Sequence, residues 1–356
     1  MTAEPGTVGT HLPEEPSSLR NFWVSSSALV TKEARWRMRG RRAFVIITVY
    51  VGLLALLVFG VQQMYERVAT AAAVDSGEPS GMVAGAISAV IGQSIFSAIL
   101  VVQTLLTLLV APALTSSSIS IEREKQTLEL LITTPASTLG MVVGKLLSSL
   151  AYVFLLVVAS VPLMSIVFAF GGIAPDDVLR AYLLLFTVAF GVGSVGLFLS
   201  ALIKRTQIAT AVSYLLVFLV VIGAFILHTY LLAISTGPAD GVRRTPPEAL
   251  LLLNPLVADV DLACTAIPES YIVTCQYIST VTGQEFDPAS PPRDAYWPRS
   301  AAAFFALGVG LTLASTQLIA PSRRLRRQRP PSDRAGQETE STLSTPGHDE
   351  PAVDVM

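Results

Sequence analysis

Charged residues are scarce in this 356-residue chain and make up 14% of it, against about 25% in soluble domains. Hydrophobic residues reach 52%, and the mean hydropathy is +0.59. A disordered chain would be polar and rich in charge, so disorder over most of the length is excluded. An ordinary soluble enzyme could not bury this much apolar surface. The composition therefore predicts a polytopic membrane protein.

Cysteine is also scarce, with only Cys264 and Cys275 in the whole chain. Two cysteines exclude a multi-cysteine metal cluster and a disulfide-dense scaffold. Both lie in a segment that the charge pattern below places outside the cell. We expect a disulfide between them, which would close a short loop and contribute about 2–3 kcal/mol. Two free buried thiols are the alternative.

Sequence signals for bond-making chemistry are missing as well. The stretch Gly140–Lys145 resembles a phosphate-binding loop only superficially, because three residues separate its glycines and Leu146 follows the lysine. A phosphate-binding loop needs four residues there and a Ser or Thr after the lysine. The net charge of −2 argues against a broadly basic nucleic-acid binder. We therefore predict no enzyme activity, no catalytic residue, no cofactor or metal in this chain, and no nucleic-acid partner.

The sequence contains several long stretches without a charged residue. Six are long enough to cross a hydrocarbon core of about 30 Å, and only helices satisfy their own backbone there. The predicted spans lie near residues 44–61, 84–114, 142–170, 179–203, 208–233 and 301–320, within a membrane domain of residues 43–320. None carries a charge at its centre, which argues against ion-coupled transport and against an intramembrane hydrolase. The predicted fold class is an all-α polytopic membrane protein.

The Lys and Arg residues indicate the orientation of these spans. With both termini placed in the cytoplasm, 18 of the 24 basic residues fall on the inner side and 6 on the outer side. Cytoplasmic loops carry the excess of Lys and Arg. The sequence therefore predicts both termini inside, in the plasma membrane. The same assignment separates the net charge of −2 into +5 inside and −7 outside.

Four segments outside the spans complete the predicted organisation. Residues 1–20 are expected to be disordered, and 21–42 to form an amphipathic helix on the inner membrane face, with a plain basic flank as the alternative. Residues 321–356 begin as a basic tail that contacts lipid and end disordered. The external loop, 234–298, contains a second apolar run at 249–260, which is too short to cross. That run is either a re-entrant or interfacial hairpin or a small packed loop, and the sequence does not decide between them.

The loop between the second and third spans, residues 115–141, carries the most informative pattern. Its charged stretch predicts an amphipathic helix over Glu122–Ile132, and Pro135 ends it because it biases the preceding residue to extended geometry. Residues Glu122–Ser137, followed by Gly144-Lys145, resemble the signature loop of ABC transporter permeases of the type-2 exporter class. The family pattern is Glu-Arg-Glu-x-Gly-Thr-Leu-Glu-x-Leu-Leu-x-Thr-Pro-x-Ser. One departure is Gln126, where the family commonly has Gly; we expect Gln to favour the helix.

The resemblance implies a function for the whole chain. It implies a permease subunit of an ATP-driven exporter that works with two copies of a separate ATP-binding subunit, which holds ATP and Mg²⁺, and with a second permease chain, identical or different. It also implies that the loop contains a coupling helix that contacts the ATP-binding subunit. The contact residues it suggests are Glu122, Arg123, Glu124, Thr127, Glu129, Leu130, Thr134 and Pro135. An ion-coupled transporter or channel, or a membrane sensor or assembly protein that binds a cytoplasmic partner, are the alternatives.

Overall fold

The computed structural model describes residues 41–76, 80–126, 138–235, 248–265 and 296–319, and all regular structure in these ranges is helical. The helices are α2 Arg41–Ser76, α3 Ser80–Thr115, α4 Ser120–Glu124, α6 Thr138–Ala159, α7 Val161–Phe170, α8 Pro175–Leu202, α9 Thr206–Phe218, η1 Leu219–Gly223 (a π-helix), α10 Ala224–Ser235, η2 Glu248–Leu250, α11 Pro255–Thr265 and α13 Tyr296–Ile319. The predicted segments 1–20 and 321–356, and almost all of 21–42, lie outside the described residues.

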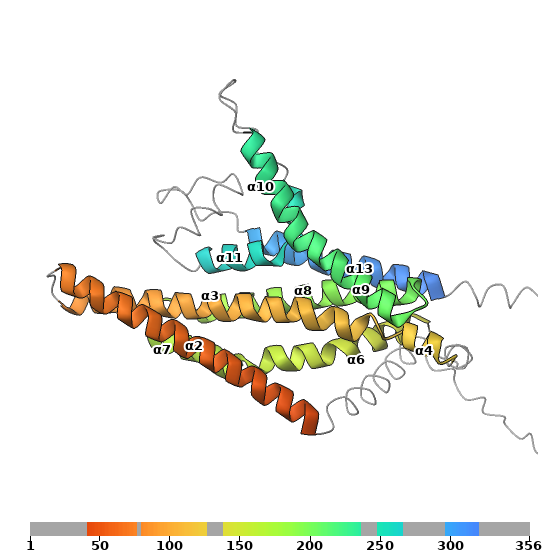
Figure 1. Ribbon diagram of the computed structural model, residues 1–356, viewed down its shortest axis with the longest axis horizontal. Coiled ribbons are helices and arrows are strands. Elements are labelled where there is room, and N and C mark those ends of the chain that lie inside the picture. The colour runs from red at the N-terminus through yellow and green to blue at the C-terminus, as the bar shows by residue number, and fades with distance from the viewer. Residues whose placement is uncertain (1–40, 77–79, 127–137, 236–247, 266–295, 320–356) are drawn as a thin grey trace, which may run out of the picture.

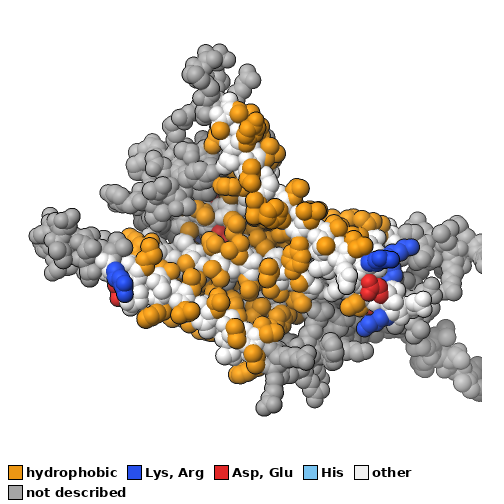
Figure 2. All heavy atoms as spheres, viewed as in Figure 1, with side chains coloured by type: hydrophobic (Ala, Val, Ile, Leu, Met, Phe, Trp, Pro, Cys, Tyr) orange, Lys and Arg blue, Asp and Glu red, His pale blue; other side chains and the backbone are white. Residues whose placement is uncertain are grey.

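Six helical stretches are long and apolar enough to span a membrane. They are Phe44–Arg67, Ser88–Glu124, Thr138–Phe170, Pro175–Leu202, Thr206–Ile234 and Tyr296–Ile319. Each overlaps one predicted span, so the predicted number of spanning helices is confirmed. The face drawn in Figure 2 has hydrophobic side chains over its middle, whereas Lys and Arg lie at its two ends. This distribution fits a polytopic membrane protein.

Helix α8 lies at the centre of the bundle and packs most extensively against α13 and α3 (Figure 1). Its glycines allow this packing. A Cβ on Gly191 would come within 2.8 Å of Phe304 on α13, and one on Gly193 within 2.7 Å of Leu150 on α6. A Cβ on Gly196 would overlap Thr115 at the end of α3. Small residues permit such close approach between membrane helices.

Polar side chains connect the helices within the bundle. The Gln103 amide of α3 donates to the Tyr50 hydroxyl of α2 at 3.3 Å and to Ser160, which separates α6 from α7. The Ser160 hydroxyl lies 3.0 Å from that of Tyr182 on α8. These bonds join four parts of the bundle at a buried position and hold the break in the third span, which Pro162 follows.

The apolar run at 249–260 is packed among the spanning helices. Helix α11 contacts α3, α8 and α13, and the Asn254 amide donates to the Val221 carbonyl at 2.9 Å. Val221 lies near the midpoint of the span Thr206–Ile234. The segment thus packs against a candidate spanning helix close to its midpoint, and the choice between a re-entrant hairpin and a packed loop stays a prediction. In Figure 1, α11 lies beside α3 and α13, while α10 turns away from the bundle.

One prediction for the loop after the second span is wrong over residues 122–126, while residues 127–132 of the expected helix lie outside the described residues. The helix expected over Glu122–Ile132 begins earlier, at Ser120, and α4 ends at Glu124. Gln126 has φ of +58°, the one positive φ outside glycine among the described residues. A left-handed residue cannot continue an α-helix, so helical structure does not run through Gln126. The expectation that Gln favours a helix there fails for the same reason, and the glycine of the family pattern suits this backbone conformation.

Candidate functional site

The candidate site is the junction around α4, which we call the α4 junction and define as residues 115–126 with the side chains that hold them. Pro112 and a turn after Thr115 end α3 and redirect the chain into α4. The Ser118 hydroxyl donates to the Thr115 carbonyl at 2.7 Å and closes that turn. Five residues of helix cannot be stable alone, so α4 depends on its surroundings.

Helix α8 supplies the missing cap at the N-terminus of α4. Ile119, the residue before the helix, has no side chain that can cap it. The Ser200 hydroxyl accepts instead from the backbone N–H groups of Ile119 at 3.0 Å and Ser120 at 2.9 Å. All three residues are buried. A capping hydroxyl satisfies N–H groups that a helix leaves free, and here it fixes the start of α4 to the central helix of the bundle.

An ion pair connects α4 to α6. The Lys145 ammonium lies 2.5 Å from a Glu122 carboxylate oxygen, and it also donates to the Ser118 carbonyl at 2.9 Å. The Lys145 side chain is 5% exposed and that of Glu122 is 21% exposed. A charge buried to this degree needs both a counter-ion and hydrogen bonds, and Lys145 has them. This lysine therefore anchors the turn before α4 and the helix itself.

A second carboxylate connects α4 to α9. A Glu124 carboxylate oxygen accepts from the Thr206 backbone N–H at 2.8 Å. Thr206 is the first residue of α9, so the negative charge lies where the helix dipole is positive and N–H groups are free. Beside it, the Ser116 and Thr210 hydroxyls lie 2.8 Å apart. α4 is thus joined to α6, α8 and α9 by side chains of known geometry.

The structure describes three of the eight predicted contact residues. Glu122 and Glu124 make the internal bonds given above, and Arg123 is half-buried. Ile121, with 40% of its side chain exposed, and Lys125 and Gln126 face outward at the end of the junction. The other predicted contact residues, Thr127, Glu129, Leu130, Thr134 and Pro135, lie outside the described residues.

Sequence reasoning missed the two residues that hold α4 from outside its own loop. The sequence pattern includes Lys145 in the family signature and among the inner basic residues, but it does not indicate that Lys145 pairs with Glu122. Its position inside a buried turn of α6 was a signal that it needed a counter-ion. Ser200 gave no signal, because serine is common in membrane helices and its partners lie 80 and 81 residues away.

The structure describes only one cysteine of the predicted disulfide. Cys264 lies in the last turn of α11, whereas Cys275 lies outside the described residues. The disulfide between them stays a prediction. Within the part of the chain that the structure describes, no group of three or more His, Cys, Asp and Glu side chains is arranged to hold a metal ion.

Comparison with known proteins identifies the architecture around this junction. A family model described as ABC-2 family transporter protein matches residues 27–266, two thirds of the chain. The match includes the first five candidate spans, the α4 junction and α11. A comparison with curated proteins gives no match. The family match confirms the resemblance found in the loop after the second span. The chain therefore belongs to the ABC-2 family of transporter proteins, as a membrane-spanning permease component.

Proposed function

We propose that this chain is the permease subunit of an ATP-driven exporter, and that the α4 junction with residues 127–137 couples it to a separate ATP-binding subunit. The observation that supports this most directly is the attachment of α4 to α6, α8 and α9 through Lys145, Ser200 and Glu124. Because α4 is bonded to three spanning helices, a displacement of α4 would move α6, α8 and α9 as well. Such a displacement requires a partner whose contacts differ between two states, as those of an ATPase do.

The eight predicted contact residues divide into two roles under this proposal. Glu122 and Glu124 act as internal connectors, because their carboxylates are already used by Lys145 and by the start of α9. The docking surface consists of Arg123 and of the residues that follow the left-handed turn at Gln126: Thr127, Glu129, Leu130, Thr134 and Pro135. Lys125 and Gln126, the last described residues before this surface, are exposed, which supports access by a partner.

The remaining parts of the proposal follow from the family and from the charge pattern. ATP and Mg²⁺ are bound by two copies of the ATP-binding subunit, and a second permease chain completes the pathway. The distribution of basic residues supports a position of both termini and the α4 junction on the cytoplasmic side of the plasma membrane, where ATP is available. Transport then runs outward from the cytoplasm or from the inner leaflet. Family membership favours this reading over an ion-coupled transporter or a membrane sensor.

Co-purification in mild detergent tests the partnership. We expect an ATP-binding subunit encoded beside this chain to co-purify with the wild type, and Glu129→Lys to reduce its recovery about tenfold, since reversing a charge at a docking surface costs over 1 kcal/mol. Glu66→Lys is the matched control at the opposite end of the bundle, and it should leave recovery unchanged. Failure of the wild type to retain any ATP-binding subunit would contradict the proposal.

A second experiment separates coupling from docking. Lys145→Met removes the anchor of Glu122 without changing the docking surface. We expect the ATP-binding subunit to co-purify with this variant, while the permease no longer alters the ATPase rate of the reconstituted complex. The charge-swapped pair Glu122→Lys with Lys145→Glu should restore part of the response. If Lys145→Met responds as the wild type does, the α4 junction does not transmit through α6.

A further inference from the structure

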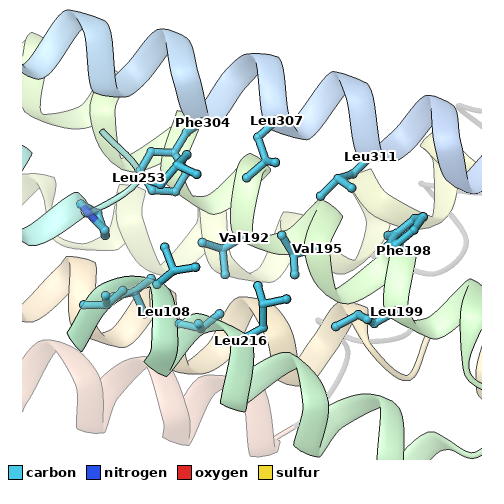
Figure 3. Close-up of a pocket in the computed structure, with 14 residues that line it drawn as sticks. Leu108, Val192, Val195, Phe198, Leu199, Leu216, Leu253, Phe304, Leu307 and Leu311 are labelled. Carbon is cyan, nitrogen blue, oxygen red and sulfur yellow. The ribbon is translucent and has the colours of Figure 1, made fainter. Parts of the chain in front are cut away.

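A cavity within the bundle lies away from the α4 junction. Its volume is about 260 Å³, and it lies between α8, α9 with η1, α13 and the segment before α11 (Figure 3). All fourteen side chains that line it are aliphatic, proline or phenylalanine. A cavity without polar groups does not retain ordered water, and it binds apolar molecules instead. The lining therefore suits an apolar occupant.

The lining residues give the cavity an elongated form. Phe304, Leu307 and Leu311 follow one face of α13, and Val192 and Val195 follow the facing side of α8 (Figure 3). The seven helical steps from Phe304 to Leu311 correspond to about 10 Å along a helix. Two parallel rows of apolar side chains enclose a slot, which suits an unbranched chain better than a compact ring.

The slot is reached across apolar surface. Leu216 of α9 lines it and is 40% exposed. The neighbouring Leu215 and Leu219 are each 63% exposed, on the outside of the span Thr206–Ile234. Hydrocarbon chains of the surrounding bilayer meet this surface, because it belongs to a spanning helix. A lipid chain can thus enter beside Leu216 without passing a charged group.

The wall formed by η1 is irregular and fixed in place. Val220 and Val221 of this π-helix line the cavity, and π-helical turns are frequent at functional sites. The Asn254 amide donates to the Val221 carbonyl at 2.9 Å. In Figure 3, Leu253 lies at the same end of the slot as Phe304, opposite Phe198 and Leu199. The segment before α11 thus closes one end of the slot and braces the widened turn.

We propose that this cavity binds one acyl chain of a phospholipid from the surrounding bilayer. The apolar lining, the slot between two helical rows and the opening onto the lipid-facing side of α9 together identify the chemistry. The site lies inside a single chain, and it does not depend on the coupling role proposed for the α4 junction. A bound chain would support η1 and the segment 251–255 from within.

Photo-crosslinking of the full chain in vesicles tests the site. The probe is a phosphatidylglycerol with a diazirine in one acyl chain, diluted into unlabelled phosphatidylglycerol. After illumination and digestion, we expect adducts on residues 192–199 of α8 and 304–311 of α13. In Val195→Phe, the added ring fills the slot, and these adducts should fall about fivefold or more. Adducts on the exposed face of α2, at Leu53, Leu56 and Phe59, should not change.

Two further variants serve as a control and as a second test of the cavity. Leu215→Phe adds a similar ring on the exposed face of α9 and should leave the cavity adducts as in the wild type. Leu307→Phe fills the slot from the opposite wall and replaces Val195→Phe if that variant does not elute as a single species. Equal cavity adducts in the wild type and in the filled variants would overturn the proposal. The proposal would also be overturned if the wild type gave no cavity adducts and the oligomeric state changed in the filled variants. In that case a second copy of this chain would be the occupant of the slot.

Discussion

At the scale of single residues, two buried charged side chains, Asp261 and Lys145, each bind groups on a second helix. Asp261 is buried, and one of its carboxylate oxygens accepts from the backbone N–H groups of Tyr296 and Trp297 at 2.8 and 2.9 Å. It thereby caps the start of α13, where a negative charge is favourable. Lys145 is used in the same way at the α4 junction. Both residues join helices that are distant in sequence.

Asp259 on α11 differs from these residues. It is 1% exposed, and neither of its carboxyl oxygens has a hydrogen-bond partner in the described residues. Desolvation by burial raises the pKa of Asp259 well above 3.8, and the nearby Thr104 hydroxyl opposes this more weakly. The neutral acid is therefore the favoured form in the folded protein.

The raised pKa of Asp259 predicts a pH dependence of stability. The folded state binds this proton more tightly than the unfolded state does, so stability falls as the pH rises from about 4 toward the raised pKa. Asp259→Asn keeps the shape and stays neutral, and it should unfold at a higher temperature than the wild type at about pH 8 and lose that part of the pH dependence. Thermal unfolding in detergent measures both effects. Asp176→Asn, at an exposed site, is the control, and an unchanged pH profile in Asp259→Asn would contradict the prediction.

Gln126 gives a second prediction at this scale. Its φ of +58° costs a residue with a side chain about 1 kcal/mol, which glycine does not pay. Gln126→Gly should therefore raise the unfolding temperature of the full chain by a few degrees, as measured by thermal unfolding in detergent. Gln126→Ala retains the penalty and should give no increase. A gain in the alanine variant that equals the gain in the glycine variant would refute the conformational explanation.

At the scale of elements, α8 organises the bundle through close contacts on three sides. Gly191, Gly193 and Gly196 bring it against α13, α6 and the end of α3. Their neighbours differ in how easily they move. Leu150 meets Gly193 with the far end of a flexible side chain, whereas Gly196 faces Thr115 with the Ser116 backbone nitrogen 3.2 Å from an added Cβ. Backbone cannot shift as cheaply as a side chain.

This difference predicts the effect of alanine in α8. Gly196→Ala should destabilise the folded protein by about 1–3 kcal/mol, because it overpacks a site bounded by backbone. Gly310→Ala on α13 has nothing within 4 Å of the added Cβ, and it should be neutral or stabilising by up to about 1 kcal/mol. Thermal unfolding of the two variants in one detergent gives the comparison. Similar unfolding temperatures for both would mean that α8 tolerates a wider spacing than the structure shows.

At the scale of the whole molecule, Lys and Arg lie at the two ends of the face drawn in Figure 2, and hydrophobic side chains cover most of the surface between them. One end contains the α4 junction with Lys204 and Arg205, and the other contains Asp176 and Arg180 at the start of α8. From the excess of Lys and Arg we expect the α4 end to face the cytoplasm.

Labelling with a membrane-impermeant maleimide tests that orientation. Asp176→Cys, whose site is 57% exposed, should react in intact cells. Lys204→Cys, also at an exposed site, should react only after the membrane is permeabilised, because the inner leaflet shields it. The wild type gives the background from the native cysteines. The opposite pattern of reaction would reverse the assignment of both termini.

Much of the fold was predictable because membrane insertion depends on local composition. The six apolar stretches, the family signature at Glu122–Ser137 and the role of the glycines in α8 each follow from short windows of sequence. The end of α4 before Gln126 could not be predicted, because the helix propensity of glutamine does not include the constraints that neighbouring helices place on the backbone. The position of the apolar run 249–260 stayed open, because twelve residues are too few to cross and suit either a re-entrant hairpin or a small packed loop.

The sequence by itself determined that six stretches, each helical in the described residues, are long and apolar enough to cross a membrane, and that the loop after the second carries the ABC-2 signature. Hydropathy and motif are properties of contiguous residues, so they need no tertiary contact. Only the tertiary structure decided that Lys145 pairs with Glu122, that Ser200 caps α4, and that the segment before α11 closes an apolar cavity. Each of these depends on residues 23 or more positions apart, and packing of the helices, rather than spacing along the chain, brings them together.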